Sequence, residues 1–249
     1  MSVIILTGCN DEETRIGGGQ PPPFSGTIFI APHLINDDDP TSYVSITYSG
    51  KSERKMLDRR VDKFITLNAH LFVATFDDGV ELEIQVNPEF DADRANVEAE
   101  KYSKVIGQMP YTLRGKLVDV AIHNGDAPFS GNKKNIVIHT MQGDKYLAEG
   151  ILAETLIHET VHAVIDKEHE KNVQWINAQK SDLGFISTYA QKHPYREDLA
   201  ESFVPYLASR FKPDRISHQL KQTIDETILY RMAYLDGLNI SLYPMVTSD

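Results

Sequence analysis

The five residues His158-Glu159-Thr160-Val161-His162 constrain this chain more than any other part of its sequence. They lie inside an apolar stretch, residues 151–166, that contains no proline or glycine and is long enough for about four helical turns. On a helix, His158 and His162 are one turn apart on the same face, so both imidazoles can reach one metal ion. Glu159 is rotated about 100° from His158, which leaves its carboxylate beside that ion.

This H-E-x-x-H pattern is typical of zinc hydrolases, in which the glutamate handles a water molecule on the metal. The alternative is an amphipathic helix with two histidines on a polar stripe. Against it, apolar side chains occur around most of the helix, which predicts burial on several faces; they are Leu156, Ile157, Val161, Val164 and Ile165. Burying two histidines and a glutamate without partners costs free energy, and a bound cation removes that cost. We therefore interpret the stretch as a metal site.

Length and composition describe an ordinary globular chain. It has 249 residues, 41% hydrophobic and 24% charged, enough for one large domain or two small ones with a proper core. The formal charge of −11 argues against nucleic acid as a partner, because no basic stripe is present to neutralise phosphates. No apolar run approaches 18 residues, so the sequence predicts no membrane-spanning helix. It gives no indication of oligomeric state.

Cys9 is the only cysteine, which excludes an intramolecular disulfide and a cysteine-based zinc site. Apolar and small residues occupy positions 3–8, and the polar residues 10–13 follow. This arrangement resembles the lipobox of bacterial lipoproteins, in which the cysteine becomes the lipidated first residue of the mature protein.

Eight residues, with no basic segment, precede Cys9. Either the true start lies upstream, or this segment is an ordinary buried strand. The Gly/Pro-rich residues 16–23 suit a tether better than a core, which favours a truncated signal. We assign residues 1–25 to a truncated lipoprotein signal and linker. They predict a bacterial cell-envelope location, lipid-anchored or secreted, with membrane contact only through the anchor.

The chain before the motif alternates between strand and helix signals. Asp77-Asp78-Gly79 is a strong hairpin turn, and Gly107 marks a helix end. Residues 51–60 are charged and poorly periodic, and residues 129–132 read as a loop. The predicted elements are a strand at 43–48, a hairpin of 71–76 and 80–86, a helix at 92–106, and strands at 117–122 and 135–140.

After residue 167 the sequence becomes helical and rich in loops. One helix is predicted over 214–235, because apolar residues recur there at a spacing of four; they are Ile216, Leu220, Ile224, Ile228 and Met232. The whole pattern predicts an α+β fold: a small mixed or antiparallel sheet, an active-site helix and a mainly helical C-terminal half. We assign residues 26–249 to this domain and leave open whether 26–66 form a separate small β extension.

Two histidines leave a tetrahedral zinc ion one protein ligand short when one position holds water. Asp166 continues the same helix and is better placed as an outer partner of the ligands, while His169 just beyond is an alternative ligand. Glu197 and Glu201 form a stronger pair, since they share a helical face where two like charges would otherwise repel. One carboxylate would bind the metal and the other would accept an N–H from a liganding histidine.

H-E-x-x-H followed by Glu197-Asp198-Leu199-Ala200-Glu201-Ser202-Phe203 is similar to the gluzincin metallopeptidases. The likeness is to the lethal-factor-type catalytic domain and, more loosely, to thermolysin; residues 70–210 also resemble bacterial lipoprotein metallopeptidases. The resemblance implies a zincin-like fold, Zn²⁺ as cofactor, Glu197 as third ligand and Glu201 as partner of His158. It also implies an edge strand beside the cleft, to which an extended substrate can pair.

The resulting hypothesis is a zinc-dependent peptidase acting on a peptide or protein, with Glu159 as general base and acid. A donor for the oxyanion is also needed; such families often place a tyrosine or histidine near the third ligand. Tyr189 is our first candidate, with His193 and Tyr195 as alternatives, and we expect Asp198 to contact backbone or the surface.

Two hypotheses from other classes remain. The chain could be a non-catalytic zinc-binding envelope lipoprotein that acts as a binding or scaffold module. The metal site could also hold a cell-wall peptide or glycan without cleaving it. An intact Glu159 favours the enzyme, because a purely structural site has no need of this residue.

Overall fold

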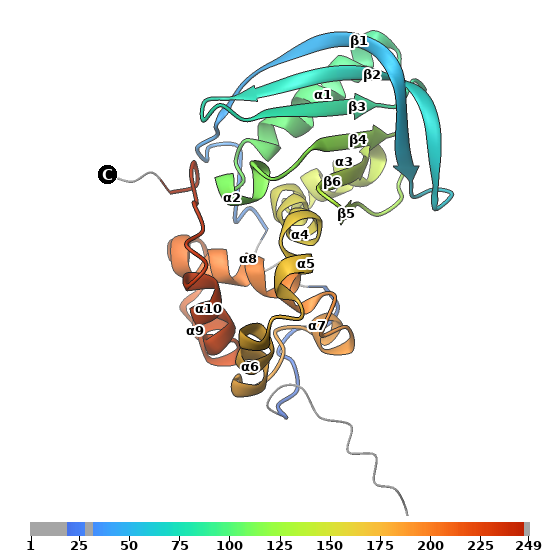
Figure 1. Ribbon diagram of the computed structural model, residues 1–249. Coiled ribbons are helices and arrows are strands. Elements are labelled where there is room, and N and C mark those ends of the chain that lie inside the picture. The colour runs from blue at the N-terminus through green and yellow to red at the C-terminus, as the bar shows by residue number, and fades with distance from the viewer. Residues whose placement is uncertain (1–18, 28–31, 247–249) are drawn as a thin grey trace, which may run out of the picture.

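The computed structural model describes residues 19–27 and 32–246. Cys9 and its apolar neighbours, on which the lipid-anchor prediction rests, lie outside the described residues. The described chain has an α+β fold, with a mixed six-stranded sheet in one half and helices alone in the other (Figure 1). None of the described helices is long and apolar enough to cross a membrane.

The sheet has the strand order β1-β2-β3-β4-β6-β5. The first three strands are antiparallel, β3, β4 and β6 run parallel, and β5 is antiparallel to β6 at the far edge. The strands are β1 Tyr43–Asp58, β2 Lys63–Phe76, β3 Glu81–Val86, β4 Asp119–His123, β5 Ser130–Asn132 and β6 Asn135–His139. The predicted hairpin around Asp77-Asp78-Gly79 is confirmed as β2–β3.

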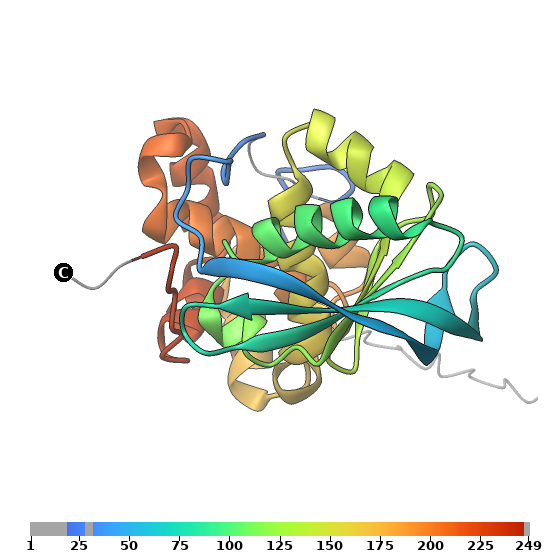
Figure 2. The same cartoon turned by 90° about the horizontal axis from the view of Figure 1, so that it is seen from above.

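Helices α1 (Ala92–Ile106) and α3 (Thr140–Ala148) lie across one face of the sheet (Figure 2). The predicted bounds of α1 are confirmed: Asp91 caps its first turn by accepting the Arg94 N–H, and Gly107 ends it. Alternate strand residues such as Ile136 and Ile138 point into the core beneath these helices.

The first hairpin is longer than the sequence predicted. The charged residues 51–60 were given no element, but 51–58 continue β1, so the strand predicted at 43–48 extends to Asp58 and pairs along β2. This outer part is largely exposed, so its side chains need no apolar alternation. Residues 43–66 thus belong to the same sheet as the rest. On the face of the sheet opposite to α1 and α3, buried side chains form a small second cluster: Met56, Ala69, Leu71, Ala121 and Val137.

The motif helix α4 (Leu152–Val164) packs against β5, β6 and the helices α1 and α3, and it is buried on several faces, as its flanking residues predicted. Residues 129–132, predicted as a loop, contain the edge strand β5, whose three residues Ser-Gly-Asn are too few for a periodic signal. Gly131 lets β5 cross α4 closely. A Cβ at this position would collide with the main-chain oxygen of Glu159, so β5 lies directly over the motif.

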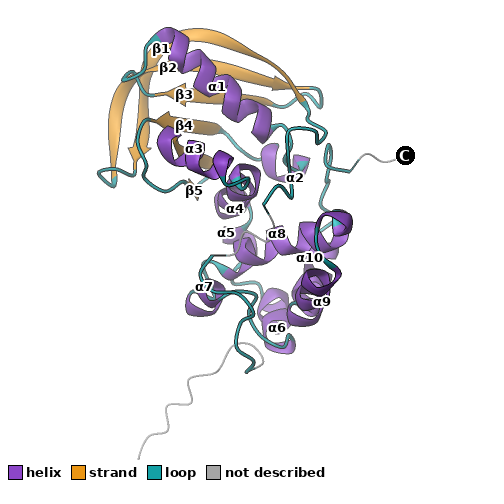
Figure 3. Ribbon diagram, turned by 180° about the vertical axis from the view of Figure 1, so that it is seen from behind, coloured by secondary structure: helices purple, strands orange, loops and turns teal. Residues whose placement is uncertain are grey.

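In the C-terminal half, the described residues form only helices and loops (Figure 3). The single helix predicted over 214–235 is wrong: the chain breaks at Ile228, whose ψ of 35° is not helical. Ile224, Ile228 and Met232 are nevertheless all buried, so the apolar stripe faces the core on both sides of the break. The remaining elements are α2 Tyr111–Arg114, α5 Asp166–His169, α6 Val173–Ser181, α7 Thr188–Lys192, α8 Asp198–Phe211, the 3₁₀ turn Pro213–Arg215, α9 His218–Thr227 and α10 Leu229–Asp236.

A fully buried arginine ties these helices together. Arg231 of α10 donates to Asp182 and to Asp198, each at 2.8 Å, and none of the three side chains is exposed. Gln179 donates to the same Asp198 oxygen at 2.8 Å. The expectation that Asp198 contacts backbone or the surface is therefore wrong. Asp198 is the first residue of α8, so this cluster fixes the start of that helix.

We predict that Arg231→Leu lowers the free energy of unfolding by about 3–5 kcal/mol, because two carboxylates are left buried without their counter-charge. Urea denaturation followed by circular dichroism measures this. Arg210→Leu, which removes a partly exposed ion pair with Asp236, is the control and should cost about 1 kcal/mol or less. Equal losses in the two variants would contradict the role given to Arg231.

Candidate metal centre

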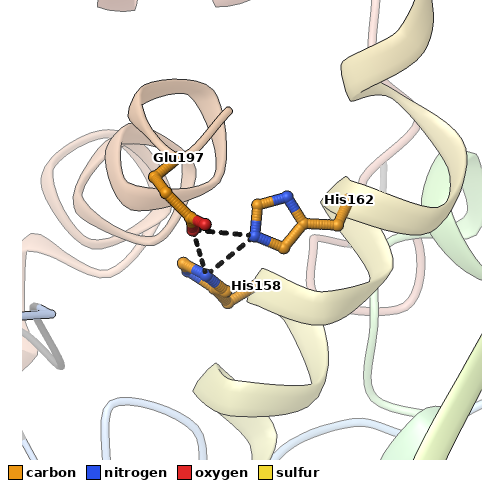
Figure 4. Close-up of side chains that lie close together, drawn as sticks. All are labelled: His158, His162 and Glu197. Carbon is orange, nitrogen blue, oxygen red and sulfur yellow. Dashed lines mark hydrogen bonds and ion pairs between the residues drawn. The ribbon is translucent and has the colours of Figure 1, made fainter. Parts of the chain in front are cut away.

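Three side chains from two elements point at one another (Figure 4). His158 and His162 come from successive turns of α4, and Glu197 immediately precedes α8, which packs against α4. The Nε2 atoms of the two histidines are 3.1 Å apart. Oε2 of Glu197 lies 3.1 Å from Nε2 of His162 and 3.7 Å from Nε2 of His158. The structure thus brings together the three residues expected to be metal ligands.

This geometry fits a small divalent cation. Four-coordinate zinc, with bonds of about 2.0–2.1 Å, holds its ligand atoms roughly 3.3 Å apart. The three distances above lie on both sides of that value. Two imidazole nitrogens and one carboxylate oxygen are also the donor set of catalytic zinc sites that keep a fourth position open.

A second layer of carboxylates backs the two histidines. Asp166 accepts a hydrogen bond from Nδ1 of His162, which leaves Nε2 free to face the centre. Glu201 lies 3.8 Å from Nδ1 of His158, an ion-pair distance rather than a hydrogen bond. Its other oxygen accepts from the hydroxyl of Ser187. Both residues expected as outer partners therefore lie on the far side of the imidazoles from the centre.

The carboxylates around His158 and His162 favour positive charge at this centre. Burial alone would lower the pKa of His162, but hydrogen bonds to Asp166 and Glu197 outweigh it and raise the pKa to about 10. Burial likewise opposes the charge on Glu197, yet the two imidazoles hold the pKa of that carboxyl well below its ordinary value. Without a metal, the centre therefore keeps a proton on His162.

Glu159 differs from the other acids at the centre. Asp166, Glu197 and Glu201 are each held by a neighbouring side chain. Glu159 is half-buried and close enough to raise the pKa of His162. Yet, within the part of the chain that the structure describes, no hydrogen bond or ion pair holds its carboxylate. Of the four acids, Glu159 is therefore the one that no described side chain holds.

Of the three candidate oxyanion donors, Tyr189 reaches the centre. Its hydroxyl donates to Oε1 of Glu197 at 3.2 Å. The ring of His193 packs edge-on against the ring of Tyr189, with 5.0 Å between the two centroids. Burial and the charge of Glu197 raise the pKa of Tyr189, so the hydroxyl keeps its proton. Tyr195 is exposed. The alternative ligand His169 bonds the Tyr234 hydroxyl and does not join the three-residue group.

Two residues that received no role from the sequence also build this centre. Ser187 caps α7 by accepting the Ala190 N–H and donates to Glu201, so it joins the helices that carry Tyr189 and Glu201. A serine just before a helix is the usual capping signal and could have indicated it. Arg196 forms an ion pair with Glu197, with 2.8 Å between Nε and Oε1. No local pattern marks an arginine for that contact.

The end of the predicted linker is attached to this centre. Phe24 forms a parallel bridge with Ser187, and its carbonyl accepts the Thr188 N–H at 2.9 Å. The N–H of Gly26 donates to the Thr188 hydroxyl at 2.8 Å. Residues 24–26 therefore run alongside the start of α7.

Comparison with protein-family models gave no match. Comparison with curated proteins and with solved structures gave no significant match either. What this centre does must therefore be inferred from its own geometry.

We predict that the affinity for Zn²⁺ rises about tenfold per pH unit between pH 6.5 and 8.5, because each bound ion must displace the proton on His162, whose metal-free pKa is about 10. Competition with a chromophoric chelator measures it. In Asp166→Asn that proton leaves at lower pH, so the dependence should flatten towards the upper end of this range. The same affinity at every pH in the wild-type protein would contradict the proton's presence.

Proposed function

We propose that this chain is a zinc-dependent metallopeptidase of the gluzincin type, with a zincin-like catalytic domain. The observation that carries the proposal is the contrast between Glu159 and its neighbours. Three acids around a two-histidine centre are engaged in holding it, and the fourth, Glu159, has no hydrogen-bond or ion-pair partner among the described residues. A site that only binds a metal does not need that unpaired acid.

His158, His162 and Glu197 would hold the ion. When bound, zinc supplies a Lewis acid that polarises a peptide carbonyl and acidifies water. Glu159 takes a proton from the attacking water and passes it to the leaving amine. Tyr189 turns its hydroxyl from Glu197 to the oxyanion of the attacked carbonyl. Asp166 fixes the tautomer of His162 throughout.

The sheet supports a peptide as the substrate. β5 ends the strand order, so its outer edge has no partner strand among the described residues. It crosses α4 at Glu159, where Gly131 touches the main chain of that residue. An extended peptide paired with this edge would pass beside the general base, and its main chain would satisfy the unpaired groups of β5.

A non-catalytic zinc-binding lipoprotein, as scaffold or binding module, is the second function that the ligand set supports. It predicts the same metal content but gives Glu159 no task. Anchoring through Cys9 and a cell-envelope location stay predictions from the sequence. They are independent of which function is correct.

We predict that Glu159→Gln retains zinc but loses peptide hydrolysis by about 10²–10⁴-fold, because proton transfer has lost its acceptor while the ligands remain. Metal content by mass spectrometry and cleavage of a mixed peptide library measure the two properties. Glu53→Gln, the same change on the exposed part of β1, is the control. Equal cleavage by wild type and Glu159→Gln, with zinc present in both, would reject the peptidase in favour of the scaffold.

We predict that Tyr189→Phe lowers kcat by about 10²–10³-fold and leaves KM nearly unchanged, because the hydroxyl acts on charge that develops only in the transition state. Steady-state kinetics on any peptide that the wild type cleaves measure this. Tyr230→Phe, an exposed tyrosine of α10, should have no effect. An unchanged kcat in Tyr189→Phe would remove this residue from the mechanism.

A further inference from the structure

Arg196 occupies an unusual position beside the centre. Its Nε forms an ion pair with Oε1 of Glu197 at 2.8 Å, and its Nη2 donates a hydrogen bond to the hydroxyl of Tyr189 at 3.4 Å. At the same time 64% of its side chain is exposed to solvent. A guanidinium therefore faces outward from the oxygen of Glu197 that does not face the two histidines.

Stability does not account for an arginine here. Glu197 is already bonded by His162 and Tyr189. An ion pair whose cation is this exposed adds little to folding, since water screens it. The contacts with Glu197 and Tyr189 also use only one edge of the guanidinium, the edge formed by Nε and Nη2. Arginine has five N–H donors in one plane, and Nη1 of Arg196 has no partner among the described residues.

We propose that Arg196 binds a carboxylate of the substrate and so selects peptides that carry one close to the cleaved bond. Through Nε and Nη2 the guanidinium stays fixed on Glu197 and Tyr189, while its outer donors are in position for a second planar carboxylate. The carboxylate belongs either to an acidic side chain or to a free carboxyl terminus. This inference rests on the proposed peptidase function and names its substrate class.

Binding is measured on zinc-loaded Glu159→Gln protein, so that no peptide is consumed. The probes are short alanine–glutamine peptides capped at both ends, the same peptides with one glutamine changed to glutamate at each position in turn, and the same peptides with a free carboxyl terminus. Calorimetric titration gives each dissociation constant. The glutamate series and the free-terminus series distinguish the two sources of the carboxylate.

At least one carboxylate peptide should bind about 10- to 100-fold more tightly than its neutral counterpart, as expected for charge-assisted hydrogen bonds. Arg196→Gln in the same background should abolish the difference. Lys192→Gln, which removes an exposed cation from the neighbouring helix α7, should preserve it. Equal binding of charged and neutral peptides, or a preference that survives Arg196→Gln, would overturn the proposal.

Arg196→Lys covers the case in which Arg196→Gln releases zinc. Lysine keeps a charge beside Glu197 but lacks the planar fork, so zinc should stay bound while the carboxylate preference falls at least threefold. A full preference in Arg196→Lys would also contradict the proposal.

The outcomes separate this inference from the proposed function. A carboxylate preference in binding, without cleavage by the wild-type protein, would overturn the peptidase and leave the role of Arg196 standing. Cleavage of neutral and charged peptides with equal kcat/KM, lost in Glu159→Gln, would leave the peptidase standing and overturn the role of Arg196.

Discussion

The meeting of two α4 imidazoles with the carboxylate that precedes α8 is the contact on which the site depends. It places ionisable groups in a largely buried position, where an unpaired charge costs several kcal/mol. The carboxylates of Asp166, Glu197 and Glu201 offset positive charge at the centre. Asp166 and Glu197 raise the pKa of His162 for this reason. A proton on His162 meets this need, and a divalent cation would meet it too, so that the two would compete for the centre.

The rest of the fold keeps that contact in place. The buried Asp182–Arg231–Asp198 cluster fixes the first residue of α8, one position after Glu197. Ser187 joins the α7 start to Glu201, and residues 24–26 form hydrogen bonds with the same segment. On the sheet side, β5 lies against α4 at Gly131. Apart from residues 24–26, which contact α7, each of these contacts joins a segment remote from the motif to α4 or α8.

Local signals in the sequence predicted several elements of the fold. The bounds of α1 follow from Asp91 and Gly107, and the β2–β3 hairpin follows from its turn. The i,i+4 histidines need only a helix to come together. Glu197, 35 positions after His162, was assigned as a ligand from the resemblance to the gluzincin motifs and not from a local signal. The structure brings its carboxylate to both histidines.

What the sequence did not predict depends on partners far along the chain. Asp198 pairs with Arg231, 33 positions away, and no local pattern marks either residue for burial. The outer half of β1 has charged side chains because much of it is exposed, so it lacks strand alternation. Ile228 shows a further limit, because the apolar spacing continues through a helix break when the side chain at the break is itself buried.

X-ray absorption spectroscopy of the zinc-loaded protein tests the central claim most directly. We expect a four-coordinate zinc ion with two imidazole nitrogens and two oxygens at about 2.0–2.1 Å, and one fewer protein oxygen in Glu197→Ala. A coordination shell with a single imidazole, or one that Glu197→Ala leaves unchanged, would contradict it.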